Sequence, residues 1–216
     1  MGLRKRYDEI LARIESSARK VGRNPDDITL VAVSKTFSAE KIFELYEFGH
    51  KNFGESRLQE ALPKIEALPS DIKWHFVGEF QSNKAKKIAQ TFTLIHSLAT
   101  ESALMKLNQL TEPVAVLLEI NIAEEAQKAG LLPGALDRFL QSALECKQVQ
   151  IEGLMTIGPA TKDPEESRLW FRKLRELAET HPNLVQLSMG MSLDFEQAVQ
   201  EGSTLVRVGT ALFGER

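Results

Sequence analysis

Cysteine is nearly absent from this sequence. Cys146 is the only cysteine among 216 residues, so the chain can form neither an internal disulfide nor a zinc site made of several thiolates. Long apolar runs are missing as well: no segment approaches the roughly 20 apolar residues of a membrane-spanning helix, and the N-terminus has no apolar signal core. We therefore expect a cytoplasmic protein without disulfides or membrane-spanning segments.

An excess of positive charge is also lacking. The 27 Lys and Arg residues are outnumbered by 30 Asp and Glu residues, the formal net charge is -3, and the basic residues are dispersed among acidic ones. This balance disfavours nucleic-acid binding. No His-x-x-x-His pair or acidic cluster with ligand spacing occurs, so we expect no metal site. The local exception is Lys84, Lys86 and Lys87, interpreted as a solvated helix face, with a partner surface or an anion contact as the alternative.

What the sequence contains is a regular alternation of apolar strand segments and amphipathic helices, enough for one domain over residues 1–216. An opening helix, with Leu3, Tyr7 and Ile10 on its apolar face, should end near Gly22. Strands are predicted at 30–36, 52–56, 73–78, 93–98, 114–121, 149–156, 184–190 and 204–209. Helices are predicted at 38–49, 57–68, 83–90, 101–110, 135–147, 165–180 and 195–200.

Three details of these helices follow from local residue preferences. Ser38 is expected to cap the helix that it precedes. Pro63 is expected to break or kink the helix predicted at 57–68. In the helix at 165–180, the residues expected to face inward are Leu169, Leu174 and Leu177.

Strands separated by helices imply a parallel sheet with right-handed crossovers. Both a closed (β/α)8 barrel of the TIM type and an open doubly wound sheet have this α/β order. The glycine-rich nucleotide fingerprints of open sheets, Gly-x-Gly-x-x-Gly and Gly-Lys-Ser/Thr, are missing. The chain stops soon after the last strand, at Phe213 and Gly214, which leaves the opening helix to cover that strand. We therefore predict the closed barrel, with the opening helix as an addition.

A strand that ends on a lysine is the most informative segment. Val31 and Val33 precede Lys35 at two-residue spacing, so the three side chains share one face of the predicted strand. In a barrel the carboxyl ends of all strands meet at one rim, where such folds place their active sites. Burial would lower the pKa of this ammonium and free the amine for Schiff-base formation with a carbonyl. The alternative is a strand-end lysine that extends into solvent.

The last strand carries a second charge on one of its faces. Arg207 shares that face with Leu205 and Gly209 and cannot lose its proton, so it needs an acceptor. Glu119 or Glu152 could supply the acceptor in a structural ion pair.

Glycines follow the last two strands, in the region where barrels of this class often bind phosphate. Gly190 and Gly209 permit a close approach of the backbone to a ligand. The hydroxyls of Ser192 and Thr210, and the amides of the helix that begins near Asp194, can donate hydrogen bonds to an anion. Together with the strand-end lysine they describe a pocket for a phosphorylated aldehyde.

Other side chains at or near strand ends could line the same pocket. For a histidine among them, core packing with one satisfied hydrogen bond is the more frequent role. These residues are Asn52, His75, Asn83, His96 and Met155.

Seven segments carry motifs that are recognisable together: 32–35 (AVSK), 52–55 (NFGE), 75–78 (HFVG), 81–84 (QSNK), 153–157 (GLMTI), 188–194 (SMGMSLD) and 206–214 (VRVGTALFG). In this order, over nearly the whole chain, they resemble the pyridoxal phosphate homeostasis protein family. That family resembles the barrel domain of bacterial alanine racemase, which is fold type III among pyridoxal-phosphate proteins. The resemblance therefore implies a single-domain fold type III barrel.

The resemblance also implies a cofactor and its contacts. Lys35 would hold pyridoxal 5′-phosphate (PLP) through a Schiff base, and Arg207 would face the pyridine nitrogen. Ser192, Gly209 and Thr210 would contact the phosphate. We predict no catalytic residue, and the predicted cofactor-binding residues are Lys35, Asn52, His75, Met155, Ser192, Arg207, Gly209 and Thr210.

The function implied is cofactor storage or delivery without established turnover. Members of the family are associated with vitamin B6 homeostasis and with amino-acid and keto-acid balance. We expect a monomer that binds PLP and passes it to apo forms of PLP enzymes.

Two other functions stay open. A PLP-dependent amino-acid racemase or lyase could use the same lysine, although the guanidinium of Arg207 opposes protonation of the ring nitrogen. Alanine racemase also uses a tyrosine as second acid/base, whereas Tyr7 and Tyr46 lie on predicted outer helices. A Schiff-base aldolase for a sugar phosphate would need the lysine but no bound cofactor.

Overall fold

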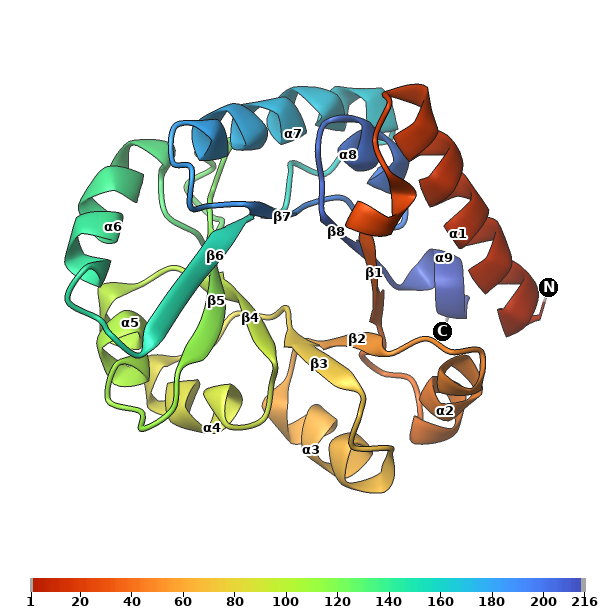
Figure 1. Cartoon of the computed structure of the whole chain (residues 1–216), viewed down its shortest axis with the longest axis horizontal. Helices are drawn as coiled ribbons and strands as arrows, with labels where there is room; N and C mark the ends of the chain where they lie inside the picture. The colour runs from red at the N-terminus through yellow and green to blue at the C-terminus, as the bar shows by residue number, and fades with distance from the viewer. Residues whose placement is uncertain (1, 215–216) are drawn as a thin grey trace.

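Eight parallel strands close into a barrel in the computed structural model, which describes residues 2–214 (Figure 1). The strands follow one another around the barrel in sequence order, and β8 pairs with β1 to close it. They are β1 Thr29–Val33, β2 Asn52–Glu55, β3 Lys73–Phe76, β4 Leu94–Leu98, β5 Val114–Glu119, β6 Val149–Met155, β7 Gln186–Ser188 and β8 Leu205–Val208. The predicted (β/α)8 barrel is confirmed.

Helices surround the barrel (Figure 1). They are α1 Leu3–Lys20, α2 Ala39–Glu47, α3 Leu58–Ala67, α4 Ala85–Ala89, α5 Glu101–Leu107, α6 Leu136–Ala143, α7 Pro164–Glu179, α8 Phe195–Gln200 and α9 Thr210–Phe213. Three short 3-10 turns complete the set: η1 Pro25–Asp27, η2 Ser82–Lys84 and η3 Pro133–Ala135. Each predicted strand and helix corresponds to one of these elements, whereas α9 is absent from the sequence prediction.

Alternation along the strands separates two apolar layers. One set of side chains packs together inside the barrel and consists of Val31, Leu94, Leu117, Met155 and Leu205. The strand residues between them, such as Ala32, Val116 and Val206, pack with the helices in a larger outer core. Because both faces of each strand are covered, the strands read as nearly continuous apolar runs. The polar residues within them are therefore exceptions that need partners.

The opening helix α1 lies where the barrel closes. Leu3 and Ile10 are buried on one face, and the helix packs against α8 and α9 (Figure 1). The guanidinium of Arg6 donates to the Leu212 carbonyl at 2.6 Å and to the Phe213 carbonyl at 3.1 Å, which ties α1 to the end of α9. The opening helix thus covers the elements around the last strand, as predicted.

Three helical details differ from the prediction. Ser38 stands at the N-cap position of α2, but its side chain makes no capping hydrogen bond. The helix α3 runs from Leu58 to Ala67 with Pro63 inside it, so the expected break does not occur, and the expected kink stays a prediction. Leu169 is 52% exposed instead of buried, because Phe171 and Leu174 define the inward face of α7.

Candidate functional site

Lys35 lies at the rim of the barrel but outside the strand. The strand β1 ends at Val33, and Lys35 occupies an exposed turn in which Thr36 has a φ of 68°. The rim position agrees with the prediction, but the expected strand alternation with Val31 is wrong. Of the two alternatives for the ammonium, burial is wrong and extension into solvent is confirmed. The strand cannot continue through this turn, because Thr36 has the left-handed backbone conformation, which is rare for threonine. An exposed amine at this position can be reached by a ligand from solvent.

A buried ion pair holds the residue before the lysine. The buried Ser34 donates from Oγ to Glu55 Oε1 at 2.7 Å, and Lys64 Nζ lies 2.7 Å from the same oxygen. Lys64 also donates to the Ser34 carbonyl at 3.0 Å. Since Ser34 directly precedes Lys35, this contact between β2 and α3 fixes the backbone from which the lysine side chain extends.

The carboxyl end of β8 lies beside that of β1. The two strands pair through Ala32 and Val208. A Cβ on Gly209 would lie 3.3 Å from the Val33 carbonyl oxygen, so the glycine allows the two strand ends to approach closely. The helix α9 begins at the next residue, Thr210. The predicted phosphate-binding residues of β8 therefore lie at the same part of the rim as the turn after β1.

Ser192 joins the loop after β7 to this turn. Its Oγ accepts hydrogen bonds from the Gly209 and Ala211 amides, both at 3.2 Å. The Asp194 amide, expected to donate to an anion, donates to the Met191 carbonyl at 3.2 Å, and Asp194 Oδ1 accepts from the Met191 amide at 2.7 Å. Hydroxyl and amide groups are therefore gathered at the Gly209 turn, and the Asp194 amide itself is held within its own loop.

Arg207 lies inside the barrel and is 4% exposed. It donates from Nη1 to Ser188 Oγ at 2.6 Å and from Nη2 to the Thr156 carbonyl at 2.9 Å. The alternative of an ion pair with Glu119 or Glu152 is wrong within residues 2–214, because two neutral oxygens, one on β7 and one directly after β6, accept these hydrogen bonds. Glu152 accepts from a glutamine of β7 instead. Burial lowers the pKa of Arg207 to about 10, against the opposing effect of the Glu119 charge, so the guanidinium stays charged at neutral pH.

Arg207 ends a series of hydrogen-bonded side chains inside the barrel, the interior row, which consists of Asn52, His75, His96, Ser188 and Arg207. His75 Nε2 lies 3.2 Å from Asn52 Oδ1, and His75 Nδ1 lies 3.0 Å from His96 Nε2. His96 Nδ1 lies 2.8 Å from Ser188 Oγ. An amide oxygen can only accept, so each neutral imidazole carries its proton on Nε2 and the row donates in one direction, from Ser188 towards Asn52.

Burial keeps both imidazoles of the interior row neutral. It lowers the pKa of His75 to about 4, assisted by the charges of His50 and Lys73, and lowers the pKa of His96 well below its ordinary value. The backbone of Asn52 is also held, since its carbonyl lies 2.7 Å from His50 Nε2. Asn52 therefore has a fixed orientation, with its side-chain oxygen directed at His75.

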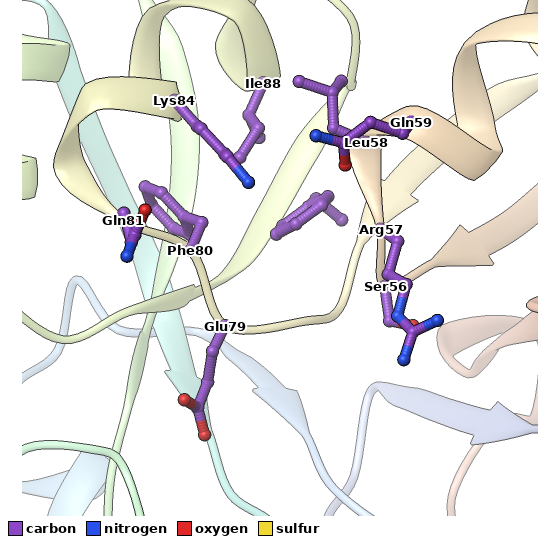
Figure 2. Close-up of a pocket in the computed structure, with 10 residues that line it drawn as sticks. Ser56, Arg57, Leu58, Gln59, Glu79, Phe80, Gln81, Lys84 and Ile88 are labelled. Carbon is purple, nitrogen blue, oxygen red and sulfur yellow. The ribbon is translucent and has the colours of Figure 1, made fainter.

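The structure does not bring all predicted residues together. Met155 is 1% exposed within the inner apolar layer. Asn83 is exposed on η2, outside the barrel. Lys84 lines a cavity of about 330 Å³ at the loops after β2 and β3 (Figure 2), whereas Lys86 lines a separate hollow with residues 109–114. The predicted basic face is therefore divided between two surfaces.

Several residues of this site have no role in the sequence prediction. Lys64 could have been noticed, because it lies on the same helical face as the buried Ala61 and is therefore a charge at a buried position. Ser188 carries no comparable signal, since a serine at a strand end is common. Its position between His96 and Arg207 depends on β7 lying next to β8.

Residues 2–214 lack two further kinds of feature. No group of three or more His, Cys, Asp or Glu side chains is arranged to hold a metal ion. Of the helices in this range, none combines the length and the hydrophobicity needed to cross a membrane.

The chain is similar to proteins of a known family. The model of the alanine racemase N-terminal domain matches residues 7–216. The pyridoxal phosphate homeostasis protein of Aquifex aeolicus (strain VF5) is 42% identical over 223 residues, which cover 98% of this chain and 97% of that protein. The chain belongs to the pyridoxal phosphate homeostasis protein family. The family member of Escherichia coli (strain K12) is 36% identical, with 96% of this chain and 94% of that one covered.

Solved structures agree with this membership. The structure of PipY of Synechococcus elongatus PCC7942 with PLP bound has a TM-score of 0.78 and 37% sequence identity, covering 94% of this chain and 100% of PipY. Alanine racemase from Corynebacterium glutamicum has a TM-score of 0.71 at 14% identity, covering 97% of this chain and 61% of the racemase. The second likeness concerns the fold alone, and it confirms the predicted fold type III barrel.

Proposed function

We propose that this chain binds PLP at the barrel rim through Lys35 and serves vitamin B6 homeostasis by storing or delivering the cofactor. The observation that carries the proposal is the position of an exposed lysine after β1 beside the Gly209 turn after β8. Membership of the pyridoxal phosphate homeostasis protein family and the likeness to PLP-bound PipY support it.

The residues present fit both ends of the cofactor. PLP offers an aldehyde to a primary amine and a phosphate to hydrogen-bond donors. Lys35 would supply the amine. The phosphate would contact Ser192, Gly209 and Thr210, whose hydroxyl and amide groups are collected at one turn. Glycine at position 209 leaves room for close approach of an anion to the backbone.

The interior row would support the ring of the cofactor from inside the barrel. We propose that Arg207 faces the pyridine nitrogen and that Asn52, whose side chain is oriented by His75, lines the pocket. Met155 would contribute to the apolar floor. A guanidinium that cannot lose its proton disfavours protonation of the ring nitrogen, which suits retention of the cofactor better than carbanion chemistry.

Storage or delivery is also supported by where the two tyrosines lie. The Tyr7 hydroxyl lies 3.4 Å from His50 Nδ1, and Tyr46 donates to Asp71 at 2.9 Å on the outer surface. Both hydroxyls therefore have partners on the outer helical layer, away from Lys35. We propose a cytoplasmic monomer whose acceptors are apo forms of PLP enzymes.

Covalent trapping tests the proposed cofactor site. The full chain is incubated with PLP and reduced with borohydride, and the modified peptide is identified by mass spectrometry. We expect the adduct on Lys35 and its loss in Lys35→Ala, which should still fold because an exposed side chain is removed. Lys84→Ala, an exposed lysine on another part of the surface, is the matched control and should label like the unmodified chain. An adduct on a different lysine would reject the assignment.

Removal of one phosphate donor tests the anion site separately. Thr210→Val should weaken PLP retention by about 1–3 kcal/mol if the hydroxyl donates to the phosphate. Equilibrium dialysis against PLP measures this change, and Thr91→Val, at a surface threonine on another part of the chain, serves as control. Unchanged retention in Thr210→Val would remove that residue from the site.

Transfer assays separate storage and delivery from turnover. We expect the PLP-loaded chain to activate an apo PLP enzyme, with a rate compared against free PLP at the same concentration. Size-exclusion chromatography with light scattering tests the monomer. Exchange of amino-acid Cα hydrogens with solvent, lost in Lys35→Ala, would instead establish a racemase or lyase.

A further inference from the structure

A small recess opens at the barrel rim beside the ends of β4 and β5. It has a volume of about 110 Å³, and its polar lining consists of Glu79, Ser97, Thr100 and Glu119. Glu119 is 6% exposed, and its carboxylate has no hydrogen bond or ion pair with any residue in the described part of the chain. A carboxylate that is buried in this way needs a partner.

The second carboxylate of the recess comes from the loop after β3. Figure 2 shows the Glu79 side chain directed away from Lys84. The loop has a defined position, because Ser97 Oγ donates to the Gly78 carbonyl at 2.5 Å. Gly78 also packs so closely that a Cβ there would lie 2.2 Å from the Ser56 carbonyl oxygen. The recess is therefore bounded by backbone that has little freedom to move.

The charges around the recess do not balance. Glu79 and Glu119 carry two negative charges when ionised, whereas Arg207, the cation that acts on Glu119, supplies one positive charge and is already bonded to Ser188 and Thr156. Burial first, and then the Glu79 charge, raise the pKa of Glu119 to about 7, with Arg207 opposing. One positive charge is lacking, and either a proton or a bound cation can supply it.

We propose that this recess binds the ammonium group of a small primary amine between Glu79 and Glu119. An ammonium offers three N–H donors, and the two carboxylates and the Ser97 hydroxyl line the recess as acceptors. The Thr100 hydroxyl already caps α5 by accepting from the Ala103 amide at 3.2 Å. The small volume disfavours branched or quaternary amines. The lining of the recess includes neither Lys35 nor the Gly209 turn, but Arg207 acts on Glu119 and is also part of the proposed PLP site, so the test uses the cofactor-free chain.

A divalent metal suits this recess less well. Its second charge would exceed the single charge that is lacking and would be repelled by Arg207. Only two carboxylates line the recess, and the exposed one, Glu79, is free to turn towards water. A monovalent ion that donates hydrogen bonds matches both the charge and the acceptors.

Titration of the cofactor-free full chain with methylammonium chloride at constant ionic strength tests the proposal. Carboxyl ¹³C resonances of labelled glutamates report binding. We expect saturable binding that is weaker by about tenfold or more in Glu119→Gln, and weaker also in Glu79→Gln. Glu112→Gln, which alters an exposed carboxylate near the opposite end of β5, is the control and should leave binding unchanged.

Proton competition provides a second readout. The titratable and charged groups that face Glu119 are Glu79 and Arg207. Since a proton and methylammonium compete for Glu119, the affinity should rise from about pH 6 to about pH 8, and this rise should be lost in Glu119→Gln. An affinity that does not depend on pH in this range would contradict the role of Glu119.

Three further results would overturn the proposal. Tetramethylammonium or sodium ions could give the same response as methylammonium. Because neither has N–H donors, the binding would then depend only on charge. Magnesium ions could bind more tightly, which would make the recess a metal site. A folded Glu119→Gln variant, verified by circular dichroism, could bind methylammonium as well as the unmodified chain.

Discussion

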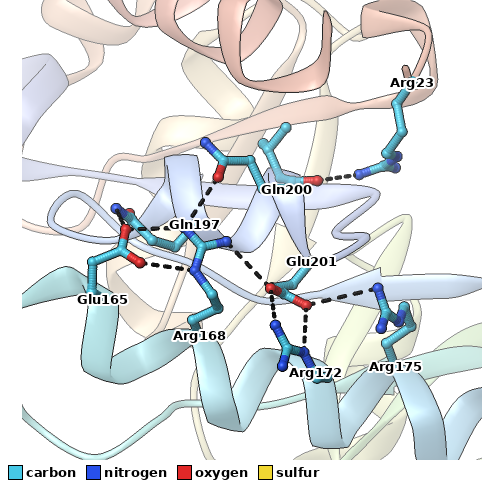
Figure 3. A network of polar contacts seen from close by, with 9 residues as sticks. Arg23, Glu165, Arg168, Arg172, Arg175, Gln197, Gln200 and Glu201 are labelled. Atoms are coloured by element: carbon cyan, nitrogen blue, oxygen red, sulfur yellow. Dashed lines mark hydrogen bonds and ion pairs between the residues drawn. The ribbon is translucent and has the colours of Figure 1, made fainter. Parts of the chain in front are cut away.

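Glu55 and Glu201 are both buried carboxylates outside the barrel interior, but they are neutralised in different ways. Glu201 is 5% exposed and is contacted by three arginines of α7, Arg168, Arg172 and Arg175 (Figure 3). Glu55 is fully buried and has a single cation, Lys64, while its second oxygen, Oε2, has no hydrogen-bond partner among residues 2–214. One carboxylate has redundant partners and the other depends on one.

The number of cations around each carboxylate corresponds to the part of the structure that the carboxylate supports. The Glu201 cluster, which consists of Glu201, Arg168, Arg172 and Arg175, joins two helices, and the loss of one arginine leaves two. The Glu55–Lys64 pair holds Ser34, the residue next to the proposed PLP lysine. A buried charge that loses its only partner is much more costly than an ion pair at the surface. We therefore expect the geometry of the candidate site to be the more fragile of the two.

The largest effect is expected from removing the single cation. Lys64→Met leaves the Glu55 carboxylate buried without a counter-charge, so the free energy of unfolding should fall by about 3–5 kcal/mol. Urea unfolding at neutral pH measures this change. PLP retention should also fall, because Ser34 loses its hydrogen bond from Lys64.

A double variant shows whether charge causes the effect. Combining Lys64→Met with Glu55→Gln removes both charges, and most of the lost stability should return. A double variant that is no more stable than Lys64→Met would show that the methylene chain of Lys64, and not its charge, supports the turn.

Acid should affect the interior row before it affects the Glu201 cluster. The pKa of His75 is about 4 in the folded chain against 6.5 for the free side chain, so the unfolded state binds more protons between these values and stability falls as the pH decreases through them. The loss is about 3 kcal/mol for His75, and His96 adds to it, as does His50 outside the row, whose pKa burial also lowers to about 4. Glu119, with a pKa of about 7, acts in the opposite direction, because its stabilising contribution is lost as the pH rises towards and beyond 7.

The Glu201 cluster responds at lower pH. Burial by itself raises the pKa of Glu201, but hydrogen bonds from Arg172 and Arg168 outweigh it and hold the pKa below its ordinary value. Its stabilising contribution is therefore kept above the ordinary glutamate pKa and lost only below it. Urea unfolding as a function of pH measures both contributions. The loss of stability between about pH 6.5 and pH 4, the histidine phase, should be smaller in His75→Asn and unchanged in Glu201→Gln. Equal effects of the two variants on that phase would contradict the assignment.

The smallest effect is expected within the redundant cluster. Arg172 is 49% exposed at its side chain, and the two remaining arginines still contact Glu201. Arg172→Ala should therefore change the urea midpoint little compared with Lys64→Met. A change as large as that of Lys64→Met would show that the three arginines are not redundant.

Particular residues show how far prediction from the sequence reaches. Lys35 could be placed at the rim because it follows an apolar strand, yet its exposure could not, since it depends on the left-handed turn at Thr36. Ser192 and Gly209 were both expected near an anion, and the structure places them in direct hydrogen-bond contact. The partners of Arg207 could not be predicted, because Ser188 and Thr156 come from other strands whose register only the closed barrel defines.

The sequence by itself determined the alternation of eight strands with helices, the helix before the first strand and the types of residue at the strand ends. These features follow from hydrophobic periodicity and from turn residues, which act over a few neighbouring positions. Only the tertiary structure decided that Lys64 reaches Glu55, that the interior row donates towards Asn52, and that Glu79 and Glu119 line one recess. Such contacts join residues from different strands and helices, and they exist only once closure of the barrel has set which strand ends are neighbours.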